Sequence, residues 1–258
     1  MSENRTVDKN TTESIKTLYA LSGLSWWPVI LFLPARLIFA FLSQSLTAGI
    51  FALGGSTNAW QDATAWWPVY STITDILCLI ALVWLTRREG MKIIDLIGAK
   101  GKDIIKQLAW TPVYLFAVAP TAILASIITQ AFYGTALPPM IAVVNLPPVG
   151  ELYSLIVWPI IWVITEELVY LGYLLPRLEV LSGKTWIAVL VVIFFWGIQH
   201  LAMPFILDEK YLISRVLAAT AAIISFPIVF VLLRRRLTPL IGVHYIADLA
   251  TAFLFIRL

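Results

Sequence analysis

The stretch Trp162-Val-Ile-Thr-Glu-Glu-Leu-Val-Tyr170 places two adjacent glutamates, Glu166 and Glu167, in the middle of an apolar segment of residues 152–175. A carboxylate that moves from water to the interior of a bilayer costs several kcal/mol unless other groups compensate it. Two adjacent carboxylates in such a segment therefore indicate a functional site inside a membrane-spanning helix. The rest of the chain has to supply the groups that make this arrangement tolerable.

The composition is that of an integral membrane protein. The 258 residues are 60% hydrophobic and 13% charged, and the mean hydropathy is +0.88. Soluble domains are only about 45–50% apolar and are about 25% charged. A net charge of +3 gives no reason to expect a nucleic-acid partner. The single cysteine, Cys78, excludes an internal disulfide.

Seven apolar stretches reach the length of about 20 residues that a helical span needs. They are residues 26–53, 65–86, 108–132, 152–175, 185–206, 211–233 and 237–257. The first stretch is long and carries Pro28, Pro34 and Arg36, so it is expected to be tilted, kinked or partly re-entrant. The sequence predicts an all-α polytopic transmembrane bundle of seven spans, or eight if one segment is re-entrant or split.

The basic residues predict the orientation of this bundle. Lys and Arg occur in the N-terminal tail and in the links after the second, fourth and sixth spans, whereas the opposite loops 54–64 and 133–151 contain none. The positive-inside rule then places the N-terminus in the cytoplasm and the C-terminus outside. We expect a cytoplasmic tail of residues 1–25, with a short amphipathic helix or a frayed terminus at 11–24, and one transmembrane domain of residues 26–258. A prokaryotic plasma membrane is compatible with this pattern.

Further ionisable residues lie within the last four predicted spans. The chain has only two histidines, His200 and His244, and each falls in an apolar stretch. Asp248 follows His244 by one helical turn, so both side chains lie on the same face of a helix. Because three separate helices supply acidic or imidazole groups, we expect one polar site. Its predicted members are Glu166, Glu167, His200, His244 and Asp248.

This set of groups suits more than one chemistry. Imidazoles and carboxylates can bind zinc or a similar divalent ion with a position open for water, and a free glutamate can act as general base on that water. The same groups can work without a metal, since Glu and His can activate water together while the second His stabilises an oxyanion. A transporter or proton relay also uses such residues. The lack of internal symmetry in the sequence argues against that class.

Buried ion pairs are the purely structural alternative. The glutamate pair could be satisfied by an intramembrane arginine, Arg36 or Arg215. Arg36 and Asp75 could also pair with each other across the first two spans.

The segment from Glu166 to Glu179, EELVYLGYLLPRLE, resembles the first motif of the CPBP (CAAX protease and bacteriocin-processing, or Abi) family of intramembrane proteases, which is related to the Ras-converting CAAX endopeptidase. The family motifs are EExxxR, FxxxH and HxxxN/D. The second is similar to Trp196-Gly-Ile-Gln-His200, with Trp in place of Phe, and the third to His244-Tyr-Ile-Ala-Asp248. The resemblance covers residues 152–253, which form the expected catalytic core.

The resemblance implies an intramembrane endopeptidase, either a metalloprotease or a glutamate-dependent enzyme. Its substrate would be a membrane-embedded or lipidated peptide or protein, of the prenylated CAAX type or of the leader or bacteriocin type. Glu166 would be the general base and would activate water with His200. His244 and Asp248 would complete the site as metal ligands or transition-state stabilisers, and Glu167 is a motif member. The predicted ligands of a divalent metal, with zinc favoured, are Glu166, His200, His244 and Asp248. An ionised carboxylate such as Asp248 cannot donate a hydrogen bond to an oxyanion but can bind a cation, which favours the metal.

One departure from the family pattern bears on activity. Leu171 stands where the first motif has arginine. The missing charge could come from Arg177 or Arg215. Alternatively the chain is a catalytically idle relative that acts as a membrane regulator or an immunity-type scaffold.

Overall fold

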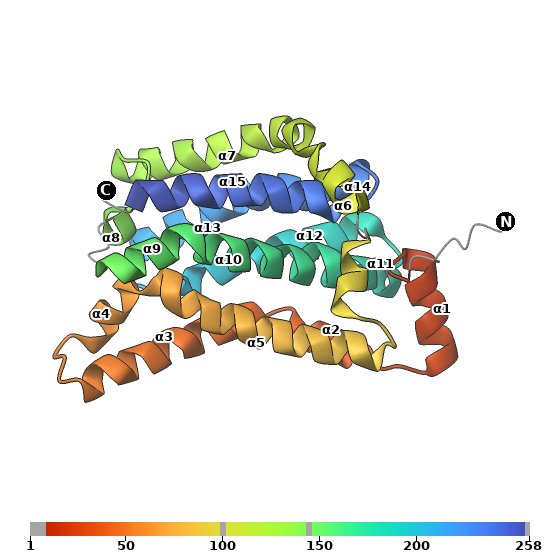
Figure 1. The fold of residues 1–258 in the computed structure, drawn as a ribbon, viewed down its shortest axis with the longest axis horizontal. Helices are drawn as coiled ribbons and strands as arrows, with labels where there is room; N and C mark the ends of the chain where they lie inside the picture. Colours follow the sequence, from red (N-terminus) through yellow and green to blue (C-terminus); the bar gives the residue numbers. More distant parts are fainter. Residues whose placement is uncertain (1–8, 99–101, 143–145, 256–258) are drawn as a thin grey trace.

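The structure is a computed structural model that describes residues 9–98, 102–142 and 146–255. In these ranges the chain forms helices that lie mostly along the long axis of the molecule, and it forms no strand (Figure 1). This confirms the all-α bundle. Residues 1–8 of the predicted tail, and Lys100 in the link after the second predicted span, lie outside the described residues.

The elements follow one another along the chain with short connections. They are α1 Thr12–Ser22, α2 Trp27–Phe32, α3 Ala35–Leu53, α4 Ala59–Ala65, α5 Trp67–Arg88, η1 Ile93–Ile97, α6 Lys102–Leu108, α7 Thr111–Tyr133, α8 Pro139–Ala142, α9 Pro148–Ile156, α10 Trp158–Glu167, η2 Leu168–Leu174, α11 Leu175–Ser182, α12 Thr185–Ile198, η3 Gln199–Ala202, α13 Glu209–Ile223, α14 Ser225–Leu232 and α15 Leu237–Phe255.

Seven helical segments within the described residues are long and apolar enough to cross a membrane. They are Ala35–Leu53, Trp67–Arg88, Thr111–Tyr133, Pro148–Ser182, Thr185–Ala202, Glu209–Leu232 and Leu237–Leu254. These agree with the seven predicted spans, and the chain is an integral membrane protein. The first stretch, which is expected to be tilted, kinked or partly re-entrant, is divided into two helices: α2 ends at Phe32, and α3 starts after Pro34. Proline lacks an N–H and its ring clashes with the preceding turn, so a continuous helix is disfavoured there.

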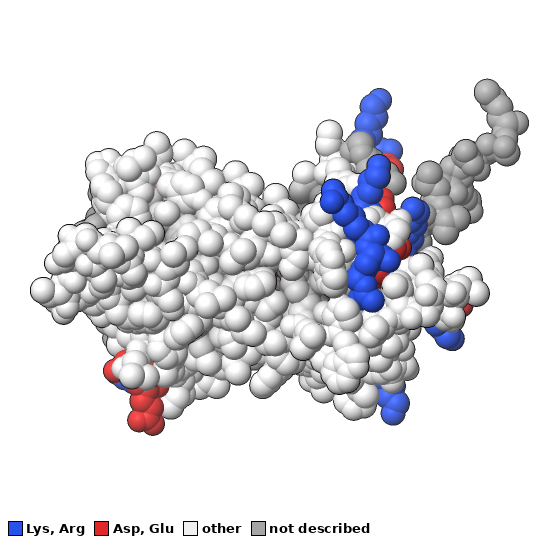
Figure 2. Space-filling view, turned by 90° about the horizontal axis from the view of Figure 1, so that it is seen from below, with Lys and Arg blue, Asp and Glu red and all other residues white. Residues whose placement is uncertain are grey.

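The charged side chains mark the two ends of the bundle. In Figure 2, Lys and Arg gather at the end where α1, α6, α11 and α14 lie in Figure 1, and the long middle of the visible surface carries no charge. Three tryptophans at this end make cation–π contacts with basic side chains. The cation lies 5.9 Å from the ring centroid for Arg88 and Trp84, 6.0 Å for Lys184 and Trp186, and 5.6 Å for Arg236 and Trp110. Tryptophan is enriched where a membrane meets water. These pairs therefore mark one membrane boundary, which the sequence predicts to be cytoplasmic.

The segment Pro148–Ser182, which carries both glutamates, lies at the centre of the bundle. Helix α10 packs against α5 on one side and α15 on the other, and residues 165–178 are all buried. Directly after Glu167 the chain widens into the π-helical segment η2. Such wide turns are rare and occur frequently at functional sites. The side chain of Asn10 donates a hydrogen bond to the carbonyl oxygen of Gly172 in this segment (2.8 Å) and ties the N-terminal region to it.

A buried polar cluster fixes α1 against the same end of the bundle. Arg177 forms a fully buried ion pair with Glu89, and its Nε donates to both oxygens of that carboxylate, at 3.2 and 3.1 Å. The hydroxyls of Tyr19 and Tyr173 also donate to Glu89 Oε1, at 2.6 and 2.9 Å. Burial raises the pKa of Tyr19, and the Glu89 carboxylate raises it further, so the hydroxyl keeps its proton at neutral pH. The predicted helix in residues 11–24 is therefore packed and not frayed.

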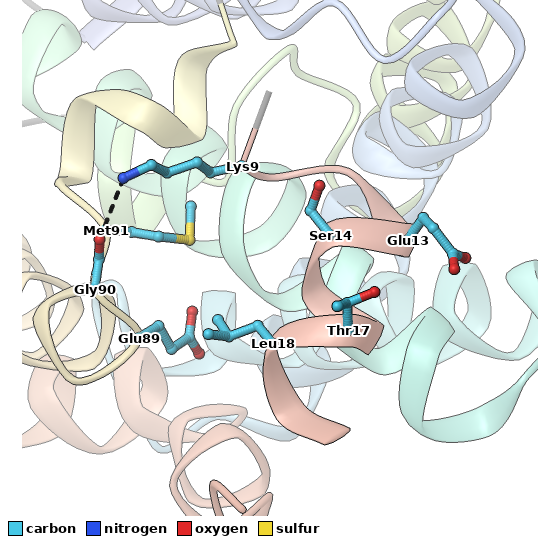
Figure 3. Close-up of a pocket in the computed structure, with 8 residues that line it drawn as sticks. All are labelled: Lys9, Glu13, Ser14, Thr17, Leu18, Glu89, Gly90 and Met91. Carbon is cyan, nitrogen blue, oxygen red and sulfur yellow. Dashed lines mark hydrogen bonds between the residues drawn. The ribbon is translucent and has the colours of Figure 1, made fainter. Parts of the chain in front are cut away.

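A pocket of about 510 Å³ lies beside this cluster, between α1 and the turn at Glu89–Met91 (Figure 3). Lys9 reaches across it to the carbonyl oxygen of Gly90, at 3.5 Å. Its other lining residues are Glu13, Ser14, Thr17 and Leu18. None of the five predicted site residues lines it, so this pocket is separate from the site.

The close approach of α15 to α7 yields a stability prediction. A Cβ on Gly242 would lie 2.6 Å from Thr111 Oγ1 and 3.0 Å from its Cγ2, so rotating the threonine would exchange one clash for another. We expect Gly242→Ala to lower the free energy of unfolding by about 1–3 kcal/mol. Thermal unfolding in detergent measures the change. Adding Thr111→Ala to the Gly242→Ala variant should restore most of the lost stability. Gly49→Ala is the matched control that should lose no stability, because a Cβ added there meets nothing within 4 Å. Equal stability of Gly242→Ala and Gly49→Ala would contradict this packing.

Candidate functional site

Four of the five predicted residues meet between α10 and α15. His244 Nδ1 lies 3.1 Å from Glu167 Oε1, and His244 Nε2 lies 3.7 Å from Glu166 Oε2. His244 Nε2 also lies 3.5 Å from Asp248 Oδ2, one turn along α15. Consecutive glutamates on a helix point about 100° apart, yet both reach the same imidazole because each faces a different ring nitrogen. The two glutamates are fully buried and His244 is 7% exposed.

His200 lies at the edge of this group, in the short helix η3 that ends the α12 span. Its Nδ1 donates to the carbonyl oxygen of Trp196, at 2.9 Å. A carbonyl can only accept, so this bond places the proton on Nδ1 and leaves Nε2 of the neutral ring as an acceptor. Within the part of the chain that the structure describes, His200 makes no hydrogen bond or ion pair with the other four residues. Trp196 links it to them.

Glu166 is held by two side chains that sequence reasoning did not assign. Trp196 Nε1 donates to Glu166 Oε2 and Gln199 Nε2 donates to Glu166 Oε1, both at 2.7 Å. Tyr170 donates in turn to Gln199 Oε1, at 3.0 Å. From the sequence, the tryptophan at the phenylalanine position of the second motif is only a large aromatic wall residue. Its indole N–H is the feature that could have indicated a contact with a carboxylate, because a buried indole usually donates to an acceptor.

Arg36 of α3 supplies the positive charge beside Glu166. Arg36 NH2 lies 3.2 Å from Glu166 Oε1, and NH1 pairs with Asp75 of α5. The sequence left the pairing of Arg36 with Asp75 open, and the structure contains it. Of the arginines that the sequence offers to the glutamates, Arg36 is the one that pairs with Glu166. Among the described residues, neither Arg177, which pairs with Glu89, nor Arg215, which donates to the carbonyl oxygen of Met203 at 3.0 Å, forms an ion pair with Glu166.

The donor atoms, as folded, do not fit the predicted zinc site. Among the described residues, no group of three or more His, Cys, Asp or Glu side chains has an arrangement that could hold a metal ion. Zinc needs ligand atoms about 2.0–2.2 Å from the ion, whereas both oxygens of Glu166 already accept hydrogen bonds and one faces a guanidinium. The metal therefore stays a prediction from the sequence.

The fold and this geometry define a polytopic membrane protein with a buried carboxylate–imidazole site. Residues 148–250 match the family model described as type II CAAX prenyl endopeptidase Rce1-like. This segment is therefore an Rce1-like domain, which confirms the resemblance drawn from the three motifs. It contains all five predicted site residues. The family supports a CAAX-type intramembrane endopeptidase as the general class of activity, with a membrane-associated substrate. Comparisons with curated proteins and with solved structures found no match.

Proposed function

We propose that this protein hydrolyses a peptide bond of a membrane-associated substrate, with Glu166 as the general base. The observation that carries the proposal is the position of Glu166. Its carboxylate is fully buried, is oriented by Trp196 and Gln199, and faces His244 at 3.7 Å. A general base needs a fixed orientation, and it must lie within hydrogen-bond reach of the water whose proton it takes. The surroundings of this carboxylate supply the orientation.

The proposed reaction uses a water molecule bound among Glu166, His244 and Asp248. Glu166 Oε2 and Asp248 Oδ2 lie 3.7 and 3.5 Å from His244 Nε2, so these three atoms are close enough together for one water beside them to contact each. Glu166 takes one proton as the water oxygen attacks the scissile carbonyl carbon. The acceptor nitrogen of His200 orients the water. Glu167 acts as the neutral acid and donates its O–H to His244 Nδ1. The single N–H of the neutral ring then lies on Nε2, where it stabilises the oxyanion that forms.

Collapse of the tetrahedral intermediate completes the hydrolysis. The C–N bond breaks, the carbonyl reforms, and the proton held by Glu166 passes to the leaving nitrogen. The products are a new carboxyl terminus and a new amino terminus. Glu167 and Asp248 hold His244 from two sides, so its ring keeps one orientation through the cycle.

A cleavage screen tests this function. The purified protein is reconstituted in bilayers with prenylated CAAX-type peptides, the same peptides without the lipid, and leader-type peptides, and the products are read by mass spectrometry. We expect new termini from at least one class with the wild-type protein and none with Glu166→Gln. Equal cleavage by both would reject the site. Intact peptides with both would favour the idle-relative hypothesis that Leu171 motivates.

Chelation gives a separate test of the metal. We expect purified, active protein to contain far less than one zinc ion per chain and to keep its activity after dialysis against a strong chelator. Elemental analysis and the residual rate measure the two quantities. One zinc per chain that is lost together with activity, and restored with it, would instead support the ligand set Glu166, His200, His244 and Asp248.

A further inference from the structure

Along Pro148–Ser182, the described helical segment that bears Glu166, no basic side chain pairs with this glutamate. The residues of η2 that follow Glu167 are uncharged and buried, and Leu171, at the arginine position of the first motif, is 0% exposed. Arg177 is the next basic residue on that helix, and its guanidinium binds Glu89, Asn10 and the carbonyl oxygen of Tyr173. A positive charge for Glu166 has to come from another helix.

Arg36 meets this need from the N-terminal half of the chain. Its guanidinium lies 3.2 Å from Glu166 Oε1 and stands over the Trp162 ring, 4.6 Å from the ring centroid. Trp162 precedes Glu166 by one helical turn. Arg36 is 1% exposed, and Glu166 is 0% exposed. In such surroundings an arginine placed without a carboxylate partner would be strongly unfavourable.

Asp75 fixes the direction of this guanidinium. It is fully buried on α5, a helix that packs against both α3 and α10, and it pairs with Arg36 NH1. The guanidinium is planar and presents its N–H groups as a rigid fork. Holding one arm on Asp75 therefore sets where the other arm points. The nitrogen of the other arm, NH2, lies 3.2 Å from Glu166 Oε1, within ion-pair distance and without a hydrogen bond between the two.

The local charges explain why this cation matters. Glu166 shares the guanidinium of Arg36 with the carboxylate of Asp75. It shares the imidazole of His244 with the acidic side chains of Glu167 and Asp248. Like charges at short range disfavour the ionised form of a buried acid, and an opposite charge within about 4–6 Å favours it. A base that stays ready to accept a proton from water thus depends on the neighbouring guanidinium.

We propose that Arg36 and Asp75 are positioning residues for the reaction, and that together they replace the arginine missing from the first motif. The inference rests on the proposed function, since it assigns a role to the partner of Glu166. Both residues lie on the first two spans, outside the matched segment 148–250. The first two spans are then part of the active centre and not merely a membrane anchor.

Steady-state kinetics of four variants test the pair on whichever peptide the wild-type protein cleaves. We expect Arg36→Met to lower kcat on the order of 100-fold with little change in KM, because general-base catalysis contributes about 10²–10⁴-fold. Arg36→Lys keeps the charge without the fork and should recover about tenfold of that loss. Asp75→Asn should lower kcat by about tenfold. The double variant Arg36→Met with Asp75→Asn should be no slower than Arg36→Met alone, since residues that act as a unit are not additive.

Arg235→Met, which breaks the half-buried pair with Glu179, is the control and should keep the wild-type kcat. Monodispersity and thermal unfolding select the folded samples. If Arg36→Met does not fold, the other two single variants still test the positioning role. A kcat equal to that of the wild type in both Asp75→Asn and Arg36→Lys would then contradict it.

The outcomes separate this inference from the proposed function. Wild-type kcat in folded Arg36→Met or Asp75→Asn, while Glu166→Gln is inactive, would overturn only the positioning role. Losses that multiply in the double variant would also overturn it. Activity retained by Glu166→Gln would overturn the proposed function itself. A loss confined to KM would assign Arg36 to substrate binding and reject the role proposed here.

Discussion

Replacing Glu166 by glutamine is expected to lower kcat by about 10²–10⁴-fold, the range that a general base contributes. The amide has the size and shape of the carboxylate, so the oxygen that accepts from Trp196 or Gln199 can be retained. It cannot take a proton from water. The loss should therefore appear in kcat, whereas KM should stay close to the wild-type value. Initial rates of peptide release over a range of substrate concentrations measure both parameters.

Glu151→Gln is the matched control for this variant. Glu151 lies in the first turn of α9, on the same helical segment Pro148–Ser182 as Glu166 and well before the site. Glu151→Gln removes one carboxylate charge by the same substitution as Glu166→Gln. We expect wild-type rates from it. A similar fall in both variants would show that the loss of Glu166 acts through the helix or the preparation and not through the chemistry.

Replacing Arg177 by methionine is expected to lower the free energy of unfolding by about 3–5 kcal/mol. The change leaves Glu89 as a buried carboxylate without its cation, and it also removes the bonds from Arg177 to Asn10 and to the carbonyl oxygen of Tyr173. Chemical unfolding in mixed micelles measures the change.

The double variant Arg177→Met with Glu89→Gln gives the matching control. It removes the uncompensated charge, and replacing both partners of a buried pair is often close to neutral. We expect it to regain much of the stability that the single variant loses. A single-variant loss below about 1 kcal/mol, the size of an exposed ion pair, would show that this cluster is hydrated and does not hold α1 in place.

The spans were predictable because they depend on composition over many residues. An error of two or three residues at the end of a span does not change its mean hydropathy, and the proline break before α3 follows from the chemistry of a single residue type. The structure also joins Glu166, Glu167, His244 and Asp248 as the sequence predicts. Ionisable groups at membrane depth have few ways to be satisfied, so their convergence is strongly favoured.

The partners of Glu166 were harder to find. Arg36 and Trp196 come from other helices, and which of several arginines reaches the glutamate depends on how the helices are rotated about their axes. No spacing in the sequence fixes that rotation. Arg177 illustrates the same point, because it lies near the first motif in the sequence yet binds Glu89 of a distant turn. Side-chain pairing across helices is decided by packing, which a linear pattern does not encode.

Isotope incorporation from labelled water tests the central claim most directly. A peptide that the reconstituted protein cleaves is incubated in H₂¹⁸O with wild type and with Glu166→Gln, and the fragments are weighed. The account predicts one ¹⁸O atom at the new carboxyl terminus with the wild-type protein and no such fragment above background with Glu166→Gln. The same labelled fragment at the same rate from both proteins would contradict the assignment of Glu166 as the base that activates water.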